Sequence, residues 1–159
     1  MLVSGRFRVL RDRAWVFETL TDILRVGQCI PGCSELEEVE AGRYTAKVRV
    51  EVGFLKLVFD VTVEVVEVAP PEFIRFRIQG KPSGFSAQLT ATAELRAKPD
   101  PGDSGEPATL VEWQLDQTLK GALGGIGQPV FRAKAEEQGA RFAQNLQRLL
   151  ESVPEGERL

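Results

Sequence analysis

Apolar and polar residues alternate with a period of two along most of this chain, a pattern typical of strands with one buried face. In the first run, Phe7 and Val9 alternate with arginines. The alternation returns near residue 36 and persists to residue 119, interrupted by glycines and prolines. It predicts seven strands, at residues 4–10, 36–40, 44–52, 57–65, 74–78, 85–95 and 111–119.

The interruptions between the later runs are short. They favour antiparallel pairing of successive strands, because parallel strands need crossovers of about a dozen residues or more. Residues 53–56 are typical of a hairpin bend, and Pro70-Pro71 should end a strand because proline cannot donate to a ladder. Residues 80–84 should form a turn, and residues 99–105 an exposed loop.

Three segments follow the helical period instead. Asp12 can cap a short helix that carries Trp15 and Leu20, and a second helical turn should run from residue 21 or 22 toward Cys29. Residues 127–153 predict a long helix, in which proline at 129 suits the first turn and proline at 154 ends the pattern. The helix repeats apolar residues at intervals of three and four, namely Phe131, Ala135, Phe142, Leu146, Leu149 and Val153.

These patterns together predict an α+β fold of the helix-grip kind. A curved, seven-stranded antiparallel sheet would wrap around the long C-terminal helix, with two short helices after the first strand. A length of 159 residues suits a single domain, which we assign to residues 1–153, with residues 154–159 as a short tail.

Charge and hydropathy narrow the functional classes. The net charge is -3 and the basic residues are scattered among acids, so we expect no nucleic-acid partner. No apolar stretch approaches the ~20 residues that cross a bilayer, and the first residues do not follow a signal-peptide pattern. We expect a cytoplasmic protein, peripheral at most to the inner face of the membrane.

The stretch Cys29-Ile30-Pro31-Gly32-Cys33 combines two cysteines with a Pro-Gly turn. A structural metal needs four ligands, whereas the chain has two cysteines and no histidine, so we expect no metal site. The turn could bring the cysteines within disulfide distance, but a reducing cytosol disfavours that bond. We interpret both cysteines as small apolar residues.

With this stretch in place, the order of elements resembles the carbon monoxide dehydrogenase G-subunit family of the START-like (SRPBCC) superfamily. The match covers nearly the whole chain and also rests on Trp15, Asp22, Tyr44, Val52-Gly53, Pro70-Pro71, Gly80, Gly121 and Gly127. The resemblance implies a START/Bet v 1-like fold whose cavity, between sheet and long helix, accepts an apolar ligand.

The resemblance also implies an accessory role beside a molybdenum hydroxylase of the carbon monoxide dehydrogenase type, in membrane recruitment or coupling to quinones. It supplies no catalytic residue and no intrinsic cofactor; a bound quinone or lipid is the expected occupant. Members that anchor themselves use a C-terminal extension. Residues 154–159 are too short for one, so we expect membrane contact without an anchor.

A glycine run, Gly121 to Gly127, precedes the long helix, where a phosphate-binding loop would lie in a dinucleotide-binding fold. Read from Gly125, the third glycine of that fingerprint is replaced by Val130. We interpret the run as a flexible connection that could gate a cavity. The residues that we expect at the cavity mouth are Gly32, Gly53, Phe54, Gly125 and Gly127.

Small inward residues support such a cavity. Alanines occupy inward positions 87, 91 and 93 of one strand, and small residues recur four apart at positions 135, 139 and 143 of the helix. Close packing of helix on sheet is the alternative explanation. We expect the cavity to be lined by Pro31, Tyr44, Phe59, Phe76, Phe85, Ala87, Trp113, Gln117, Phe131, Ala135 and Phe142.

Gln117 and Tyr44 are the polar residues expected on the inward faces. Either could donate a hydrogen bond to a ligand carbonyl, such as that of a quinone, or be satisfied within the protein. The acidic residues of the strands alternate onto the outward face, and no histidine is present to act as a base. We therefore expect a binding protein without catalytic residues. A cyclase or hydrolase on the same fold and a docking module with a filled core are the alternatives, and the oligomeric state is open.

Overall fold

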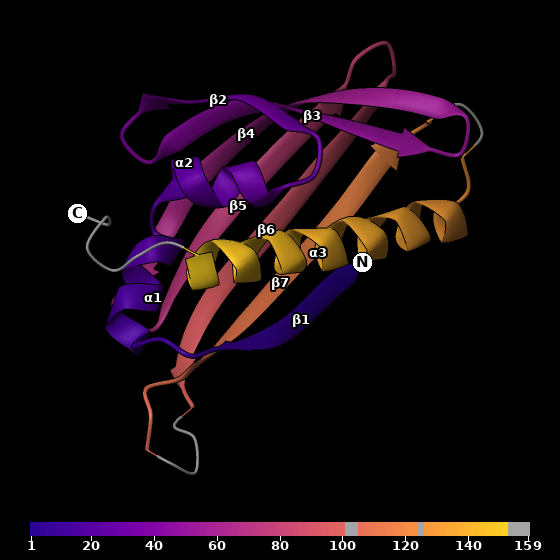
Figure 1. The fold of residues 1–159 in the computed structure, drawn as a ribbon. Helices are drawn as coiled ribbons and strands as arrows, with labels where there is room; N and C mark the ends of the chain where they lie inside the picture. The colour runs from indigo at the N-terminus through magenta and orange to yellow at the C-terminus, as the bar shows by residue number, and fades with distance from the viewer. Residues whose placement is uncertain (101–104, 124–125, 153–159) are drawn as a thin grey trace.

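The structure is a computed structural model that describes residues 1–100, 105–123 and 126–152 (Figure 1). One long helix lies across one face of a single curved sheet. The elements in chain order are β1 (Leu2–Val9), α1 (Arg13–Leu20), α2 (Ile23–Val26), a 3-10 turn η1 (Gly27–Cys29), β2 (Cys33–Glu40), β3 (Arg43–Val52), β4 (Leu55–Ala69), β5 (Phe73–Pro82), β6 (Ala87–Pro99), β7 (Thr109–Gly121) and α3 (Gln128–Ser152).

The sheet confirms the predicted fold. Its order is β1-β7-β6-β5-β4-β3-β2 and every neighbouring pair is antiparallel. The strands from β2 to β7 follow one another as a meander because each connection is short, and β1 joins the far edge beside β7. The sheet curves around α3, as a helix-grip fold requires (Figure 1).

Most helices and strands begin or end where the sequence predicts, because capping, proline and glycine residues act there. The Asp12 carboxylate accepts a hydrogen bond from the Trp15 backbone amide at 3.3 Å and caps α1. Pro70 and Pro71 separate β4 from β5, and Gly53 takes a positive φ of 62° in the two-residue turn between β3 and β4. The predicted end of the long helix at Val153 lies outside the described residues, as do residues 101–104 of the predicted loop.

The turn predicted at residues 80–84 is wrong in its first part. β5 continues to Pro82, and Gly80 is paired with Val61 on one side and Leu89 on the other. The physical reason is that ladder pairing from both neighbouring strands outweighs the weak strand preference of a single glycine. The turn is therefore confined to the residues between Pro82 and Ala87.

Two apolar clusters form the core on the concave face of the sheet. The larger joins the short helices and the C-terminal half of α3 to the sheet, through residues such as Leu20, Ile74 and Leu146. The smaller contains Val52, Leu57, Phe59 and Leu123, at the end where the β3–β4 hairpin and the start of α3 lie (Figure 1). The candidate site lies between these clusters.

Candidate ligand-binding site

A belt of small and polar residues separates the two clusters on the concave face. Ala46, Gly80 and Ala91 are buried there but belong to neither cluster, and Gln117 is paired with Ala91 across β6 and β7. A methyl group placed on Gly80 would meet its nearest neighbours at 3.5 Å or more, an ordinary contact distance. This part of the concave face is therefore short of side-chain volume.

Gln117 is the polar side chain of this belt and is only 6% exposed. Its backbone N–H donates to the Met1 carbonyl at 2.9 Å, and its carbonyl accepts from the Met1 amine at 2.8 Å, so the backbone is fixed. Within the described ranges, no hydrogen bond joins the side-chain amide to another group of the protein. The amide atoms keep some contact with solvent, so they remain able to form a hydrogen bond with a ligand that enters the belt.

Tyr44, the other inward polar candidate, lies beside a carboxylate of the protein. Its side chain is buried, and Glu38 lies opposite it on β2. Burial raises the pKa of Tyr44, and the Glu38 carboxylate raises it further. The Tyr44 hydroxyl therefore has an acidic neighbour within the protein, whereas the Gln117 amide has no hydrogen-bond partner among the described residues.

Trp113 forms the wall next to this belt and depends on two glycines. A Cβ atom at Gly5 of β1 would come within 2.8 Å of the indole ring, and one at Gly139 of α3 within 2.7 Å. The ring of Phe142 meets the indole edge-on, with centroids 6.4 Å apart. Only glycine at both positions lets the indole fit between β1 and α3.

The Cys29–Cys33 stretch ties α3 to the sheet. The Asn145 side chain donates to the Cys29 carbonyl at 2.9 Å, and the Gln138 side chain donates to the Pro31 carbonyl at 3.4 Å. Gly32 has a φ of 80°, and its carbonyl accepts from the Arg49 backbone N–H at 3.0 Å. Pro31 is consequently held in a buried position beside α3.

Both cysteines are free thiols in surroundings that suppress their ionisation. Burial raises the pKa of the Cys29 thiol to about 11 and also raises the pKa of Cys33. The Cys29 Sγ lies 3.8 Å from the Arg25 carbonyl. Because the thiolate is the reactive form, neither cysteine is activated as a nucleophile or a metal ligand.

The structure distributes the remaining lining candidates over both clusters. Phe76, Ala135 and Phe142 belong to the larger cluster or pack against it, with Tyr44 and Trp113. Phe59, Phe85 and Ala87 belong to or pack against the smaller one, and Phe131 is half-buried in the first turn of α3. The candidates thus flank the belt on both sides, and their contact with a ligand stays a prediction.

The mouth candidates lie at different places. Gly53 and the exposed Phe54 form the tip of the β3–β4 hairpin, and the Gly127 carbonyl accepts from the Phe131 amide where α3 begins. Gly32 lies in the Cys29–Cys33 stretch, where a Cβ atom would come within 2.1 Å of the Arg49 carbonyl oxygen. Gly125 lies outside the described residues.

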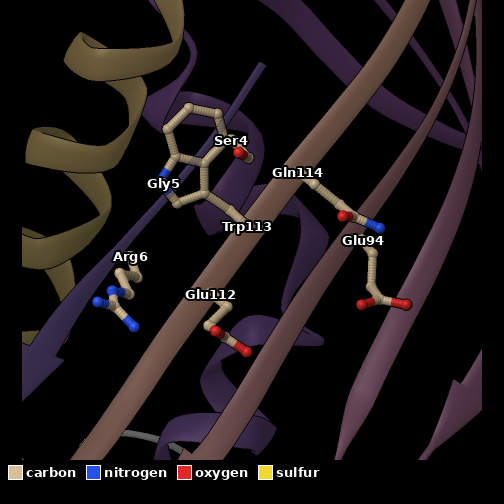
Figure 2. A pocket seen from close by; sticks show the side chains of 7 residues that line it. All are labelled: Ser4, Gly5, Arg6, Glu94, Glu112, Trp113 and Gln114. Atoms are coloured by element: carbon tan, nitrogen blue, oxygen red, sulfur yellow. The ribbon is translucent and has the colours of Figure 1, made fainter. Parts of the chain in front are cut away.

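Two hollows are found on the outer face of the sheet. One, of about 550 Å³, is lined by residues of β2 to β5, including Glu37, Lys47 and Asp60. Figure 2 shows the other, of about 350 Å³, where Arg6, Glu94 and Glu112 are among the lining residues and the Trp113 indole lies beside Gly5. Their charged linings do not suit an apolar ligand.

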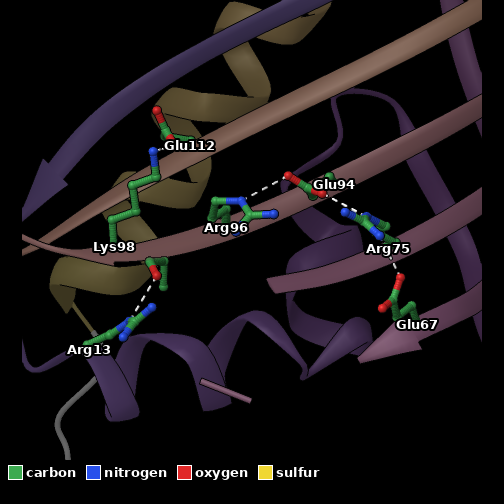
Figure 3. A network of polar contacts seen from close by, with 8 residues as sticks. Arg13, Glu67, Arg75, Glu94, Arg96, Lys98 and Glu112 are labelled. Carbon is green, nitrogen blue, oxygen red and sulfur yellow. Dashed lines mark hydrogen bonds and ion pairs between the residues drawn. The ribbon is translucent and has the colours of Figure 1, made fainter. Parts of the chain in front are cut away.

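Three acids of the outer face, Glu67, Glu94 and Glu112, are engaged in ion pairs (Figure 3). The Glu94 side chain is only 14% exposed and accepts from Arg75 Nε at 2.8 Å and Arg96 Nε at 3.1 Å. Burial by itself would raise the pKa of Glu94, but the hydrogen bonds from Arg96 and Arg75 outweigh it and lower the pKa. This carboxylate therefore stays ionised near neutral pH and stabilises the outer face.

Sequence reasoning missed several residues that shape the site. The amide donors Gln138 and Asn145 lie on a helix face that the apolar period marks only as polar, and Gly5 gives no signal in a strand run. Ala46 and Gly80 are also absent from the expected lining. A periodic pattern tells which face is inward, but it does not tell which inward positions lie between clusters.

The fold defines the class of protein. Among solved structures, the chain is similar to a conserved protein from Geobacillus kaustophilus, with a TM-score of 0.78, 20% identity and coverage of 94% of this chain and 95% of that one. A START superfamily protein from Mycobacterium smegmatis has a TM-score of 0.63 at 18% identity, covering 94% and 96%. The ZhuI aromatase/cyclase from a Streptomyces species has a TM-score of 0.66 at 16% identity, covering 94% and 93%. The chain therefore has the START-like helix-grip fold.

Within that class, the family model for the carbon monoxide dehydrogenase G-subunit (CoxG) matches residues 5–151. The chain belongs to the CoxG family, as the resemblance in its sequence predicts. No curated protein sequence matches the chain. No helix within the described residues combines the length and apolar character that crossing a bilayer requires.

Proposed function

We propose that this protein binds a lipophilic small molecule between the sheet and α3, with the Gln117 amide as its polar anchor. The observation that carries the proposal is an inward-facing amide with no hydrogen-bond partner among the described residues, on a belt of small residues between two apolar clusters. Ligand pockets are typically apolar with a few placed polar groups. A ligand with an apolar body and a carbonyl or hydroxyl group fits this arrangement.

A quinone or a lipid is the ligand class that we favour, since both combine such groups. Membership of the CoxG family supports a role beside a molybdenum hydroxylase of the carbon monoxide dehydrogenase type. In that role the protein would recruit the enzyme or couple it to an electron acceptor, in the cytoplasm or at the inner face of the membrane.

Organic extraction of the purified protein, followed by mass spectrometry, tests the proposal directly. We expect a quinone or lipid in near-stoichiometric amount. Protein that repeatedly yields no extractable lipophile, and that takes up none when incubated with quinones or phospholipids, would favour the docking module with a filled core.

The variant Gln117→Leu tests whether the Gln117 amide anchors the ligand, because it removes the amide and should leave the fold intact. We expect the affinity for a carbonyl-bearing ligand to fall about fivefold, corresponding to roughly 1 kcal/mol. Without ligand, the variant should be as stable as the wild type or more stable, because a polar side chain without a protein partner is replaced by an apolar one on the inward face. Gln88→Leu, on the exposed outer side of β6, is the matched control and should leave the affinity unchanged. Unchanged affinity in the Gln117 variant would remove this residue from the site.

The second candidate function is a cyclase-like enzyme, which the structural similarity to the ZhuI aromatase/cyclase favours. The two functions differ in turnover. A cyclase would convert its substrate into a ring-closed product, and the rate would depend on a residue of the concave face, whereas a carrier would return its extracted ligand unchanged. Incubation with candidate ligands and analysis of the products distinguishes them.

A further inference from the structure

One end of the molecule differs from the rest in its charge and carries the most exposed large apolar side chain of the described residues. There the β3–β4 hairpin, the β5–β6 turn, the end of β7 and the start of α3 come together (Figure 1). Residues 51–56, 81–86, 119–123 and 126–134, which form this end, contain five lysines and arginines and one glutamate, a net charge of +4. The whole chain has a net charge of -3, so the remainder carries -7.

Most of these lysine and arginine side chains are exposed and form no ion pair within the described residues. Lys56, Lys81, Lys120 and Arg132 are exposed, and none forms an ion pair within the described residues. In the same set, Lys134 pairs with Glu137 at 3.5 Å. By contrast, Arg75, Arg96 and Lys98 of the outer face are all paired with acids. The free cations are therefore available to an anionic partner.

The same end presents the most exposed large apolar side chain of the described residues. Phe54 is 93% exposed at the tip of the hairpin, and Val130 in the first turn of α3 is 49% exposed. Gly53, with its positive φ, makes the turn tight, so Phe54 projects without a neighbour that could cover it. Singly exposed apolar side chains are common, but this one is almost wholly in solvent and belongs to the end that carries the unpaired cations.

We infer that this end, the cationic rim (Phe54, Lys56, Lys81, Lys120, Val130 and Arg132), docks on an anionic lipid surface. Each lysine or arginine near such a surface contributes to binding by charge, and an aromatic side chain enters the headgroup region. A single projecting side chain suits insertion between lipids, whereas a stable protein interface needs about 800 Å² of matched surface on each partner.

The inference rests on the proposed function in one respect, namely that a carrier must exchange its ligand with a bilayer. The rim lies directly over the smaller apolar cluster, to which Leu123 and the half-buried Phe85 contribute. Docking there would place the lipid surface next to the space between sheet and α3. Binding to the surface itself does not require a bound ligand.

Flotation with lipid vesicles tests the rim. We expect the protein to float with vesicles of phosphatidylcholine and phosphatidylglycerol, far less with phosphatidylcholine alone, and less at high salt, which screens charge. The triple variant Lys56→Gln, Lys120→Gln, Arg132→Gln should lower partitioning by about tenfold or more. Phe54→Ser should lower it several-fold on its own.

Two control variants make the same kinds of change at sites away from the rim. Arg6→Gln, Arg141→Gln, Arg148→Gln removes the same charge from exposed sites away from the rim, and Leu10→Ser removes a side chain that is 65% exposed after β1. Both controls should float like the wild type. Equal loss in rim and control variants would overturn the inference, as would equal flotation with neutral and anionic vesicles.

Two further outcomes separate the alternatives. Rim-dependent binding of soluble polyglutamate without rim-dependent flotation would indicate an acidic protein partner and overturn lipid docking. Extraction and mass spectrometry of each variant report ligand content independently of flotation. Protein that floats but never yields a lipophile contradicts the proposed function alone, and protein that holds a lipophile but does not float contradicts the rim alone.

Discussion

At the scale of single residues, the Cys29–Cys33 stretch depends more on its glycine than on its sulfurs. Gly32 combines a left-handed backbone, which strains most other residues, with an approach to the Arg49 carbonyl that leaves no room for a Cβ atom. The cysteines, in contrast, are protonated neighbours of this turn. The stretch is thus a structural junction between η1, β3 and α3.

Gly32→Ala should destabilise the protein by about 2 kcal/mol or more, measured as the free energy of unfolding in urea. Gly84→Ala is the matched control, because Gly84 has a φ of 83° but no atom within 4 Å of an added Cβ. The control should lose only the free energy of unfolding that a non-glycine residue costs at a positive φ, about 1 kcal/mol. Equal destabilisation of the two variants would show that the contact with Arg49 carries no weight.

The thiols provide a second residue-scale prediction. Because the pKa of Cys29 is raised to about 11, this thiol should react far more slowly with a disulfide reagent at pH 8 in the folded protein than in denaturant. The Cys33→Ser variant isolates Cys29, and the Cys29→Ser variant isolates Cys33. A Cys29 rate in the folded protein equal to that in denaturant would contradict the burial that raises its pKa.

At the scale of elements, α3 is attached to the sheet by apolar packing along its C-terminal half and by two amide side chains. Leu146 and Leu150 are the buried residues of the helix, whereas Phe131 and Ala135 in its first turns are only half-buried. Asn145 and Gln138 add hydrogen bonds to the Cys29–Cys33 stretch. The start of α3 is therefore the less tightly packed end.

Asn145→Ala should lower the free energy of unfolding by about 1–3 kcal/mol, because it leaves the partly buried Cys29 carbonyl without its donor. Gln144→Ala changes the neighbouring exposed position of the same helix and should be nearly neutral. Chemical denaturation with unchanged m-values measures both. If the two variants unfold alike, the amide does not secure the helix.

At the scale of the whole molecule, the outer face of the sheet is stabilised by charge and should weaken in acid. The pKa of Glu94 is lowered in the folded state, so its contribution is present above the ordinary pKa of about 4.3 and is lost as pH falls through the folded value. The network extends from Glu67 through Arg75 and Glu94 to Arg96 (Figure 3).

The wild type should therefore lose stability below about pH 4 more steeply than Glu94→Gln, which cannot ionise at this position. Glu72→Gln, at an exposed residue between β4 and β5, is the control and should keep the wild-type pH profile. Thermal melting between pH 7 and pH 2.5 measures both profiles. Parallel curves for Glu94→Gln and the wild type would contradict the role of this carboxylate.

The sequence by itself determined the fold. Strands of period two and one long helix of period 3.6 leave a single way to cover the apolar face, and short connections impose antiparallel neighbours. It also determined that Gln117 and Trp113 face inward, because alternation on β7 fixes their side.

Only the tertiary structure decided which of these inward groups is free. Tyr44 and Gln117 are alike in the pattern, but the Glu38 carboxylate lies beside Tyr44, while no partner reaches the Gln117 amide among the described residues. The gathering of cations and Phe54 at one end likewise required the folded chain, since its segments are separated in sequence. The physical reason is that periodicity fixes which side a residue faces, whereas partners depend on register and on contacts between distant elements.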